Sequence, residues 1–152
     1  MPEISIASPV GPITLREEKG RIVALSWERP RRRGDDGSDS PLLAEAAEQV
    51  AAYFAGRRVA FDLPLGPRGT PYQERVWKRL SRIGFGHTES YGGLARRLGT
   101  SPRAVGAACA RNPLPILIPC HRVLAGSRGL GGYSGRGGLK TKRYLLRLEG
   151  AR

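Results

Sequence analysis

Apolar and polar residues alternate along the first part of the chain. From residue 3 to residue 28, apolar positions fall largely on every second residue, and turn signals occur at residues 8–12 and 19–20. Such alternation is typical of strands that bury one face, so this region predicts a small sheet. The apolar positions are Ile4, Ile6, Ile13, Leu15, Ile22, Val23, Leu25 and Trp27.

The spacing changes to a helical period after residue 40. Ser40 and Pro41 are typical of an N-cap and a first helical turn, and Gly56 is a suitable stop. The expected buried face consists of Leu43, Ala46, Ala47, Val50 and Phe54. A short strand at residues 59–61 follows. A connector rich in Pro and Gly, residues 63–69, then indicates a boundary between domains 1–66 and 67–152.

The second half of the chain is predicted to be mostly helical. Residues 70–73, Thr-Pro-Tyr-Gln, form a capping box, and further helices are expected to begin at Ser90 and Ser101 and to end at Gly99 and Asn112. A last helix is expected over residues 141–148. The inward-facing residues predicted for the first of these helices are Val76, Trp77, Leu80 and Ile83. Those predicted for the last helix are Tyr144, Leu145 and Leu148. The fold class is therefore α/β (α+β): a small sheet-plus-helix lobe and a mostly helical domain.

The two short helices joined by residues 99–101 have the pattern of a helix-turn-helix. In the second of them, residues 103–111, long side chains stand at the ends and the middle is nearly all small. Small residues permit close backbone approach, either to a neighbouring helix or to a DNA groove. The charge of the region favours the DNA-facing interpretation.

Charge is distributed unevenly between the two halves. Residues 1–64 carry nine Lys and Arg against ten Asp and Glu, whereas residues 65–152 carry 17 against three. Such asymmetry points to a polyanionic partner for the second half, and nucleic acid is favoured over a merely well-solvated basic surface. No basic amphipathic helix carries bulky apolar anchors, so a membrane surface is not expected as a partner.

Other features exclude several classes of protein. The chain shows neither a signal peptide nor an apolar run long enough to span a bilayer, so we expect a cytoplasmic protein, nucleoid-associated in a prokaryote. Two cysteines and two histidines without ligand spacing predict no disulfide framework, no metal site and no cofactor. The glycine-rich run 129–138 lacks the spacing of a nucleotide-binding loop and fits a loop that closes over a small pocket.

Residues 119–123, Pro-Cys-His-Arg-Val, carry the candidate chemistry. The apolar run 116–118 predicts a strand that leads Cys120 and His121 into a loop. A small buried structural cysteine would give the same pattern. His121 and Arg122 are expected to favour the thiolate of Cys120. Because sequence neighbours point in different directions, a relay through one water is easier than direct thiol–imidazole contact. Glu149 is the candidate acid that orients His121; a role confined to the helix end is the alternative.

These motifs resemble those of the O6-alkylguanine-DNA alkyltransferases. The most specific segment is residues 111–123, supported in chain order by residues 70–73, 90–91, 103–106 and 132–134. The resemblance implies a ribonuclease-H-like N-terminal lobe and a helix-turn-helix C-terminal domain. It also implies DNA repair by irreversible, single-turnover transfer of an alkyl group from O6-alkylguanine in double-stranded DNA to a cysteine, with base flipping.

The resemblance also implies roles for individual residues. Cys120 would accept the alkyl group, His121 and Glu149 would assist it, and Asn112 would brace the helix-turn-helix against this segment. The positions that would contact DNA are Tyr91, Arg103, Ala104 and Arg111. Those that would line the substrate pocket are Val123, Tyr133 and Ser134. A monomer is expected. A non-catalytic protein that binds alkylated DNA and a thiol hydrolase using Cys120 and His121 are the alternatives.

Overall fold

The structure is a computed structural model that describes residues 2–28, 40–125 and 137–151. The contacts within it divide the chain into two compact units, Met1–Arg68 and Gly69–Arg152. The predicted boundary after residue 66 lies two residues before this division, and the separate roles of the two domains stay a prediction. None of the helices in the described residues is long and apolar enough to span a lipid bilayer.

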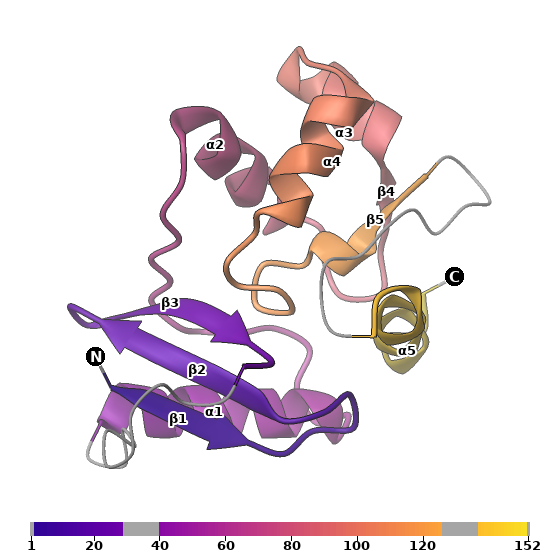
Figure 1. The fold of residues 1–152 in the computed structure, drawn as a ribbon. Helices are drawn as coiled ribbons and strands as arrows, with labels where there is room; N and C mark the ends of the chain where they lie inside the picture. The colour runs from indigo at the N-terminus through magenta and orange to yellow at the C-terminus, as the bar shows by residue number, and fades with distance from the viewer. Residues whose placement is uncertain (1, 29–39, 126–136, 152) are drawn as a thin grey trace. The chain divides into compact units, whose positions relative to one another are not determined.

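The first unit contains a three-stranded antiparallel sheet, as the alternating pattern indicates (Figure 1). The strands β1 (Glu3–Ile6), β2 (Ile13–Glu18) and β3 (Arg21–Ser26) are hydrogen-bonded in chain order. In the β2–β3 pair, Leu15 lies opposite Leu25, and both side chains are buried. The central strand therefore supplies much of the core of this unit, and helix α1 packs against the sheet.

Helix α1 (Pro41–Phe54) begins where the sequence predicts, because the Ser40 side chain accepts a hydrogen bond from the backbone N–H of Leu43. Its buried face differs from the expected one at two positions, because Ala47 and Phe54 are only half-buried while Gln49 and Tyr53 are buried. Spacings of three and four residues alternate along a helix face, and Tyr53 continues the stripe one turn beyond Val50. The full set of buried residues is Leu43, Ala46, Gln49, Val50 and Tyr53.

The short strand predicted at residues 59–61 is wrong. Val59 is 59% exposed. The Gln49 side chain binds the backbone of Asp62: its Nε2 donates to the carbonyl oxygen at 3.1 Å, and its Oε1 accepts from the N–H at 2.9 Å. Pairing with the sheet occurs later, where Ile22 and Leu65 form a parallel bridge. A side chain of α1, rather than a neighbouring strand, thus satisfies the backbone after the helix.

The second unit contains the predicted helix-turn-helix. Helix α2 (Pro71–Leu80) begins with a complete capping box at Thr70, and α3 (Tyr91–Leu98) is followed by α4 (Pro102–Ala110) after a short turn. Gly99 ends α3 in the left-handed conformation with φ of 68°, which glycine adopts without strain. The predicted starts of these helices are confirmed, and α4 ends one residue before the expected end at residue 111.

Trp77 joins α2 to α4 in the core of this unit. Its indole Nε1 donates a 2.8 Å hydrogen bond to the carbonyl oxygen of Ala108, and the ring is buried together with Val76, Leu80 and Ile83, as predicted. The ring also packs onto the backbone at Gly69, where an added Cβ would lie 2.5 Å from it. A glycine is therefore required just before the capping box.

The chain from residue 112 to residue 125 does not form the strand expected at residues 116–118. Ile116 has φ of 75°, and the N–H of Ile118 donates to the carbonyl oxygen of Leu114, so the apolar run folds into a turn. A 3₁₀ turn, η1 (Cys120–Arg122), follows. The chain then enters β5 (Val123–Leu124), which pairs in parallel with β4 (Glu89–Ser90).

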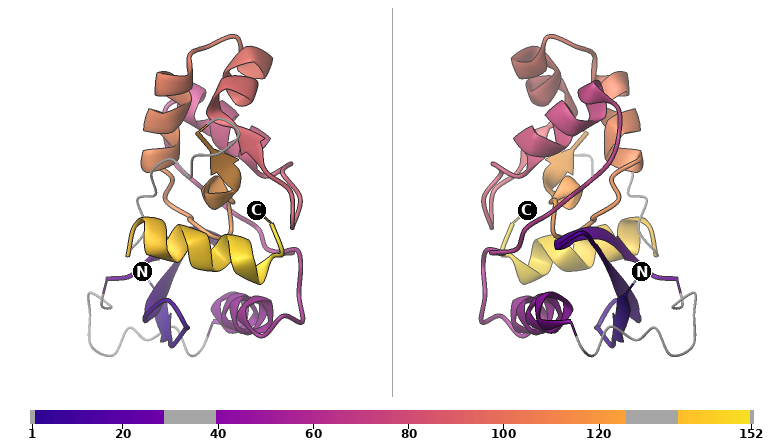
Figure 2. Two further views of the ribbon diagram at one scale, coloured as in Figure 1. Left: turned by 90° about the vertical axis from the view of Figure 1, so that its right-hand side faces the viewer. Right: turned by 90° about the vertical axis from the view of Figure 1, so that its left-hand side faces the viewer.

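Helix α5 (Leu139–Leu148) packs beside η1 (Figures 1 and 2). It begins two residues before the predicted start, and the predicted inward position of Tyr144 is wrong, because this side chain is 38% exposed. Leu145 is buried as predicted, whereas Leu148 is only half-buried. The buried face of α5 is therefore rotated about the helix axis from the expected one. The buried residues of α5 are Thr141, Lys142, Leu145 and Leu146.

Candidate active site

The turn η1 places Cys120 and His121 in the interior of the second unit. The N–H of Cys120 donates to the carbonyl oxygen of Ile118 at 2.8 Å, and the N–H of Arg122 donates to the carbonyl oxygen of Pro119 at 3.0 Å. A 3₁₀ helix has three residues per turn, so the side chains of Cys120 and His121 leave the backbone in different directions. Cys120 is 4% exposed and His121 is fully buried.

Asn112 connects the end of α4 to this turn. Its Nδ2 donates a 2.9 Å hydrogen bond to the carbonyl oxygen of Ile118, and its Oδ1 accepts from the N–H of Leu114 at 2.9 Å. The Asn112 side chain also lowers the pKa of the Cys120 thiol, although by less than burial raises it. One buried amide thus links the turn after α4 to the carbonyl oxygen of Ile118, two residues before Cys120.

Glu149, at the C-terminal end of α5, completes the site. Its Oε2 lies 2.7 Å from His121 Nε2, and Arg122 donates to Oε1 from Nε at 2.8 Å and to Oε2 from Nη2 at 2.9 Å. Both side chains of the His121–Glu149 pair are fully buried. Hydrogen bonds therefore connect His121 to Glu149, 28 residues later in the chain, and Asn112 to the segment that carries Cys120.

These contacts determine which nitrogen of His121 can act as a base. A carboxylate only accepts hydrogen bonds, so His121 Nε2 carries the proton in the contact with Glu149. Burial lowers the pKa of His121, and this outweighs the opposite effect of Glu149, so the ring is neutral. Nδ1 is then the unprotonated nitrogen, and it is buried without a hydrogen-bond partner among the described residues.

The expected low pKa of the Cys120 thiol is wrong for this structure. Burial raises the pKa of Cys120; the Asn112 side chain and the charge of Lys142 lower it, but by less. Arg122, which was expected to stabilise the thiolate, is instead bound to Glu149. The thiol is therefore stored in its protonated form and needs a base to become a nucleophile.

Lys142 belongs to the site and escaped the sequence analysis. It is fully buried, its Nζ donates a 2.6 Å hydrogen bond to the carbonyl oxygen of Val123, and it lies 5.7 Å from the centre of the Tyr91 ring. Burial lowers the pKa of Lys142. The signal that could have found it is a lysine three residues before Leu145, on the apolar stripe of α5.

Tyr91 and Cys109 share this environment. Burial raises the pKa of Tyr91 to about 12 and that of Cys109 to about 12, and the negative charge of a Cys120 thiolate contributes to both shifts. Cys109 is buried on the inner side of α4, 11 residues before Cys120 in the sequence. Both are free thiols.

We expect both thiols to stay protonated at neutral pH. Their pKa values are higher in the folded state than in the unfolded chain, so they stabilise the fold below the ordinary thiol value of 9.0 and this contribution is lost as the pH rises above it. Ultraviolet titration of thiolate absorbance, in the wild type and in Cys109→Ser, measures each group. A thiolate signal from Cys120 at neutral pH would contradict this assignment.

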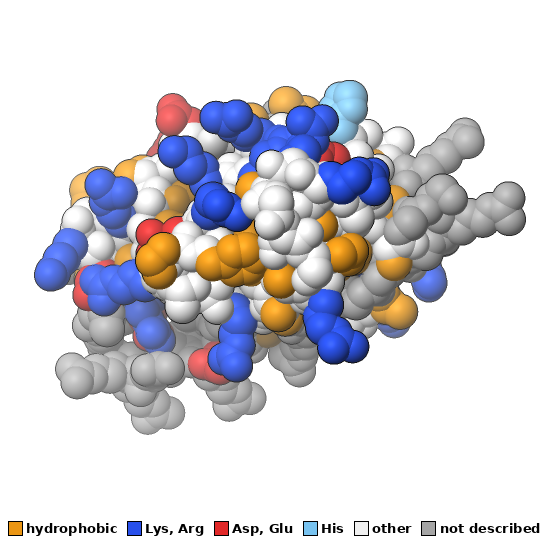
Figure 3. Space-filling view, turned by 90° about the horizontal axis from the view of Figure 1, so that it is seen from above, with side chains coloured by type: hydrophobic (Ala, Val, Ile, Leu, Met, Phe, Trp, Pro, Cys, Tyr) orange, Lys and Arg blue, Asp and Glu red, His pale blue; other side chains and the backbone are white. Residues whose placement is uncertain are grey.

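The residues assigned to DNA contact lie on α3 and α4 or at their ends. Arg103 is exposed in the first turn of α4, Arg111 is exposed at its C-terminal end, and Ala104 is half-buried. On the face that Figure 3 shows, Lys and Arg side chains lie around an area of uncharged and apolar side chains. The exposed cations of the described part of this unit are Arg75, Lys78, Arg82, Arg96, Arg97, Arg103, Arg111, Lys140, Arg143 and Arg147.

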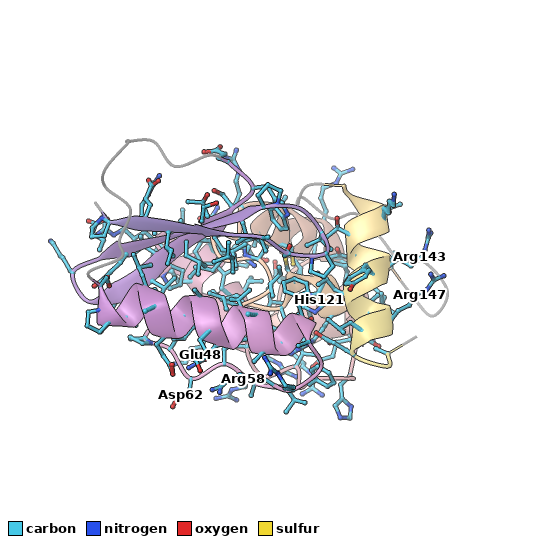
Figure 4. The ribbon with its side chains drawn as sticks, turned by 90° about the horizontal axis from the view of Figure 1, so that it is seen from below. Glu48, Arg58, Asp62, His121, Arg143 and Arg147 are labelled. Carbon is cyan, nitrogen blue, oxygen red and sulfur yellow. The ribbon has the colours of Figure 1, made fainter. Side chains whose placement is uncertain are left out.

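The three acids of this unit do not neutralise that surface. Glu149 is buried in the site, Glu74 accepts from the N–H of Gly69 at 3.2 Å, and Glu89 pairs with Arg79 at 2.7 Å and, of the exposed cations, with Arg97 at 3.6 Å. Arg143 and Arg147 point away from α5, on the side opposite to the interior position of His121 (Figure 4). The unit thus presents unpaired positive charge, as a phosphate-binding surface requires.

Two predicted pocket residues, Tyr133 and Ser134, lie outside the described residues, whereas Val123 is fully buried in β5 beside η1. Within the described parts of the chain, no group of three or more His, Cys, Asp or Glu side chains is arranged to hold a metal ion.

Comparison with known proteins gives matches over both units. The 6-O-methylguanine DNA methyltransferase DNA binding domain matches residues 71–151, and the ribonuclease-like domain of the same proteins matches residues 1–67. The constitutive methylated-DNA–protein-cysteine methyltransferase of Bacillus subtilis is 40% identical over 93% of this chain and 91% of its own. The enzyme of that name from Methanosarcina barkeri is 41% identical over 95% of this chain and 94% of its own.

Solved structures show the same similarity. The crystal structure of the O6-methylguanine methyltransferase of Mycobacterium tuberculosis superposes with a TM-score of 0.85 at 39% identity, covering 98% of this chain and 92% of that one. A structure from the same organism in complex with DNA gives a TM-score of 0.86 at 41% identity, covering 99% and 93%. The mixed α/β fold and its helical DNA-binding domain are thus those of these proteins.

Proposed function

Since the chain belongs to the 6-O-methylguanine DNA methyltransferase family, we propose that it repairs DNA by transferring an alkyl group from O6 of guanine to Sγ of Cys120. The observation that carries this proposal is the buried thiol of Cys120, followed in the turn η1 by a neutral His121 whose Nε2 is held by Glu149 at 2.7 Å. A thiol with a raised pKa needs a general base, and the site supplies one.

His121 acts as that base through one water molecule. Its Nδ1 is the unprotonated nitrogen, and the proton of the Cys120 thiol reaches it through the water, while Nε2 stays hydrogen-bonded to Glu149. The Cys120 sulfur then forms a bond to the alkyl carbon as the bond from that carbon to guanine O6 breaks. The electron pair of the broken bond stays on the guanine, which accepts the transferred proton.

Lys142 and Asn112 prepare the thiol for this step. The ammonium of Lys142 and the amide of Asn112 both favour the negatively charged form of Cys120, against the opposing effect of burial. In a site closed to water these two contributions act more strongly than they would in solution. The thiolate therefore forms at the moment of transfer rather than persisting in the resting protein.

The substrate is double-stranded DNA, and the guanine leaves the base stack to reach Cys120. A thiol that is 4% exposed cannot reach O6 inside a duplex, so base flipping is required. Tyr91 crowds the phosphate of the target nucleotide, while Ala104 and the rest of α4 approach the groove. Arg111 adds a phosphate contact. Val123, together with Tyr133 and Ser134, lines the pocket for the flipped base.

Intact mass measurement tests the proposal. After incubation with DNA that contains O6-methylguanine, the mass of the protein should rise by one methylene unit, on the peptide that carries Cys120. A thioether is inert at neutral pH, so each molecule should react once. Tight binding to the lesion without a mass change would instead support a non-catalytic lesion-binding protein. Repeated hydrolysis of an ester or peptide would support a thiol hydrolase.

Arg103 is expected to stabilise the flipped state. It is exposed in the first turn of α4, where its guanidinium can occupy the space that the extruded guanine leaves. Unstacking a base costs a few kcal/mol, so Arg103→Ala should slow transfer from duplex DNA strongly, yet hardly affect transfer from free O6-benzylguanine. The measurement is the single-turnover rate at saturating protein with each substrate.

Arg111→Ala is the matched control for Arg103. It removes an exposed arginine from the other end of α4, and as a phosphate contact it should weaken DNA binding at moderate salt without slowing the bound complex. An Arg103→Ala protein that reacts at the wild-type rate on saturated duplex would show that Arg103 is one more phosphate contact.

A further inference from the structure

Arg122 is bound on three sides within the site. Its Nε and Nη2 donate to the two oxygens of Glu149 at 2.8 and 2.9 Å, and its Nη1 donates to the carbonyl oxygen of Ile83 at 2.6 Å. The guanidinium also lies 6.0 Å from the centre of the Phe85 ring. One buried side chain therefore connects η1 to the segment after α2 and to the C-terminal end of α5.

This arrangement restrains the carboxylate as well as neutralising it. A planar guanidinium that binds both carboxylate oxygens fixes the plane of the carboxylate. The anchor on Ile83, a backbone carbonyl, prevents the guanidinium from following Glu149 if that side chain moves. Glu149 Oε2 is then shared between Arg122 Nη2 and His121 Nε2, with its position set by Arg122.

We propose that Arg122 is a positioning residue for alkyl transfer: it holds Glu149 so that His121 keeps its proton on Nε2 and its basic lone pair on Nδ1, and its charge keeps the imidazole neutral. The inference rests on the proposed function, because a base at His121 matters only if Cys120 must be deprotonated. The alternative is an ion pair that merely joins three segments of the fold.

The charges around His121 give the direction of the expected effect. Glu149 favours its protonated form, whereas burial and the positive charges of Arg122 and Lys142 oppose protonation. Without Arg122 one opposing charge is gone, and the charge of Glu149 is no longer shared, so the pKa of His121 rises. A larger fraction of His121 is then protonated at neutral pH and cannot accept the thiol proton. In a plot of the transfer rate against pH, the fall in rate at low pH (the acid limb) therefore moves to higher pH.

Two substitutions of Arg122 and one control separate positioning from simple stabilisation. Arg122→Gln removes both the positive charge and the pair of nitrogens that bind the two oxygens of Glu149, an arrangement called the fork below. Arg122→Lys keeps the charge and loses the fork. Arg79→Gln is the matched control, because Arg79 is a partly buried arginine of the same unit that binds a different glutamate, Glu89, at 2.7 Å. Single-turnover transfer from duplex O6-methylguanine is measured across pH for each protein whose circular dichroism is native.

A second readout does not depend on transfer. The chain has two histidines, and NMR titration of their ring protons follows His121 directly, with the exposed His87 as an internal reference. Arg122→Gln should raise the pH at which His121 titrates and slow transfer at neutral pH by about tenfold or more, with recovery at higher pH. Arg122→Lys should leave the acid limb near that of the wild type and still reduce the rate, and Arg79→Gln should change neither.

Several outcomes would overturn the proposal. One is a folded Arg122→Gln protein whose His121 titration and acid limb match those of the wild type. Another is an equal shift in Arg79→Gln. If Arg122→Gln does not fold, Arg122→Lys decides, and a wild-type rate in that protein rejects positioning by the fork. If the wild-type protein transfers no alkyl group, the proposed function fails, whereas the NMR titration still tests the effect of Arg122 on His121.

Discussion

Replacing Cys120 with serine is expected to abolish alkyl acceptance completely while DNA binding persists. The hydroxyl fits the space of the thiol, but it is far less acidic, and His121 cannot turn it into an effective nucleophile for an alkyl carbon. The measurement is intact mass after incubation with duplex O6-methylguanine, together with binding of the same duplex. The mass should not change, and the affinity should stay within a few fold of the wild type.

Cys109→Ser is the matched control, because it changes the other buried free cysteine. Burial on the inner side of α4 raises the pKa of the Cys109 thiol to about 12, so it should take no part in transfer, and Cys109→Ser should still gain one methylene unit. A label on Cys109 in the wild type, or a mass increase in Cys120→Ser, would show that the acceptor is assigned to the wrong thiol.

Glu149→Gln is expected to reduce stability and transfer together. It leaves the Arg122 guanidinium buried without its carboxylate, and breaking a buried ion pair by removing one partner costs about 3–5 kcal/mol of the free energy of unfolding. It also replaces the carboxylate, which only accepts, with an amide that can either accept from His121 Nε2 or donate to it, so the proton is no longer held firmly on Nε2 and transfer should slow by about a hundredfold. Urea unfolding and single-turnover kinetics measure the two effects.

Glu89→Gln provides the comparison. Glu89 pairs with Arg79 and Arg97, but its side chain is partly exposed, so its loss should cost only about 0–1 kcal/mol and leave transfer unchanged. A loss of stability in Glu149→Gln no larger than in Glu89→Gln would show that the buried network contributes little. Wild-type transfer in Glu149→Gln would remove Glu149 from the mechanism.

The sequence alone determined the features that depend on neighbours in the chain. Ser40, Thr70, Ser90 and Ser101 each begin a helix as predicted, because an N-cap side chain bonds a backbone N–H three residues away. Gly99 ends α3 for a similarly local reason. The alternation before residue 28 likewise predicted the sheet. The motif around Cys120 predicted the thiol and the imidazole of the candidate site from one short segment, whereas Asn112 was predicted through the family resemblance.

Only the tertiary structure decided what depends on distant residues. Lys142 is buried because the carbonyl oxygen of Val123, 19 residues away, receives its ammonium, and no local pattern specifies that partner. Arg122 turns to Glu149 and Ile83 rather than to Cys120, and the surrounding core removes water from the thiol, so its pKa rises where adjacent cations had predicted a fall. Capping is a local hydrogen bond, whereas desolvation and charge pairing depend on the whole fold. The site residues could therefore be predicted from the sequence, but their protonation states could not.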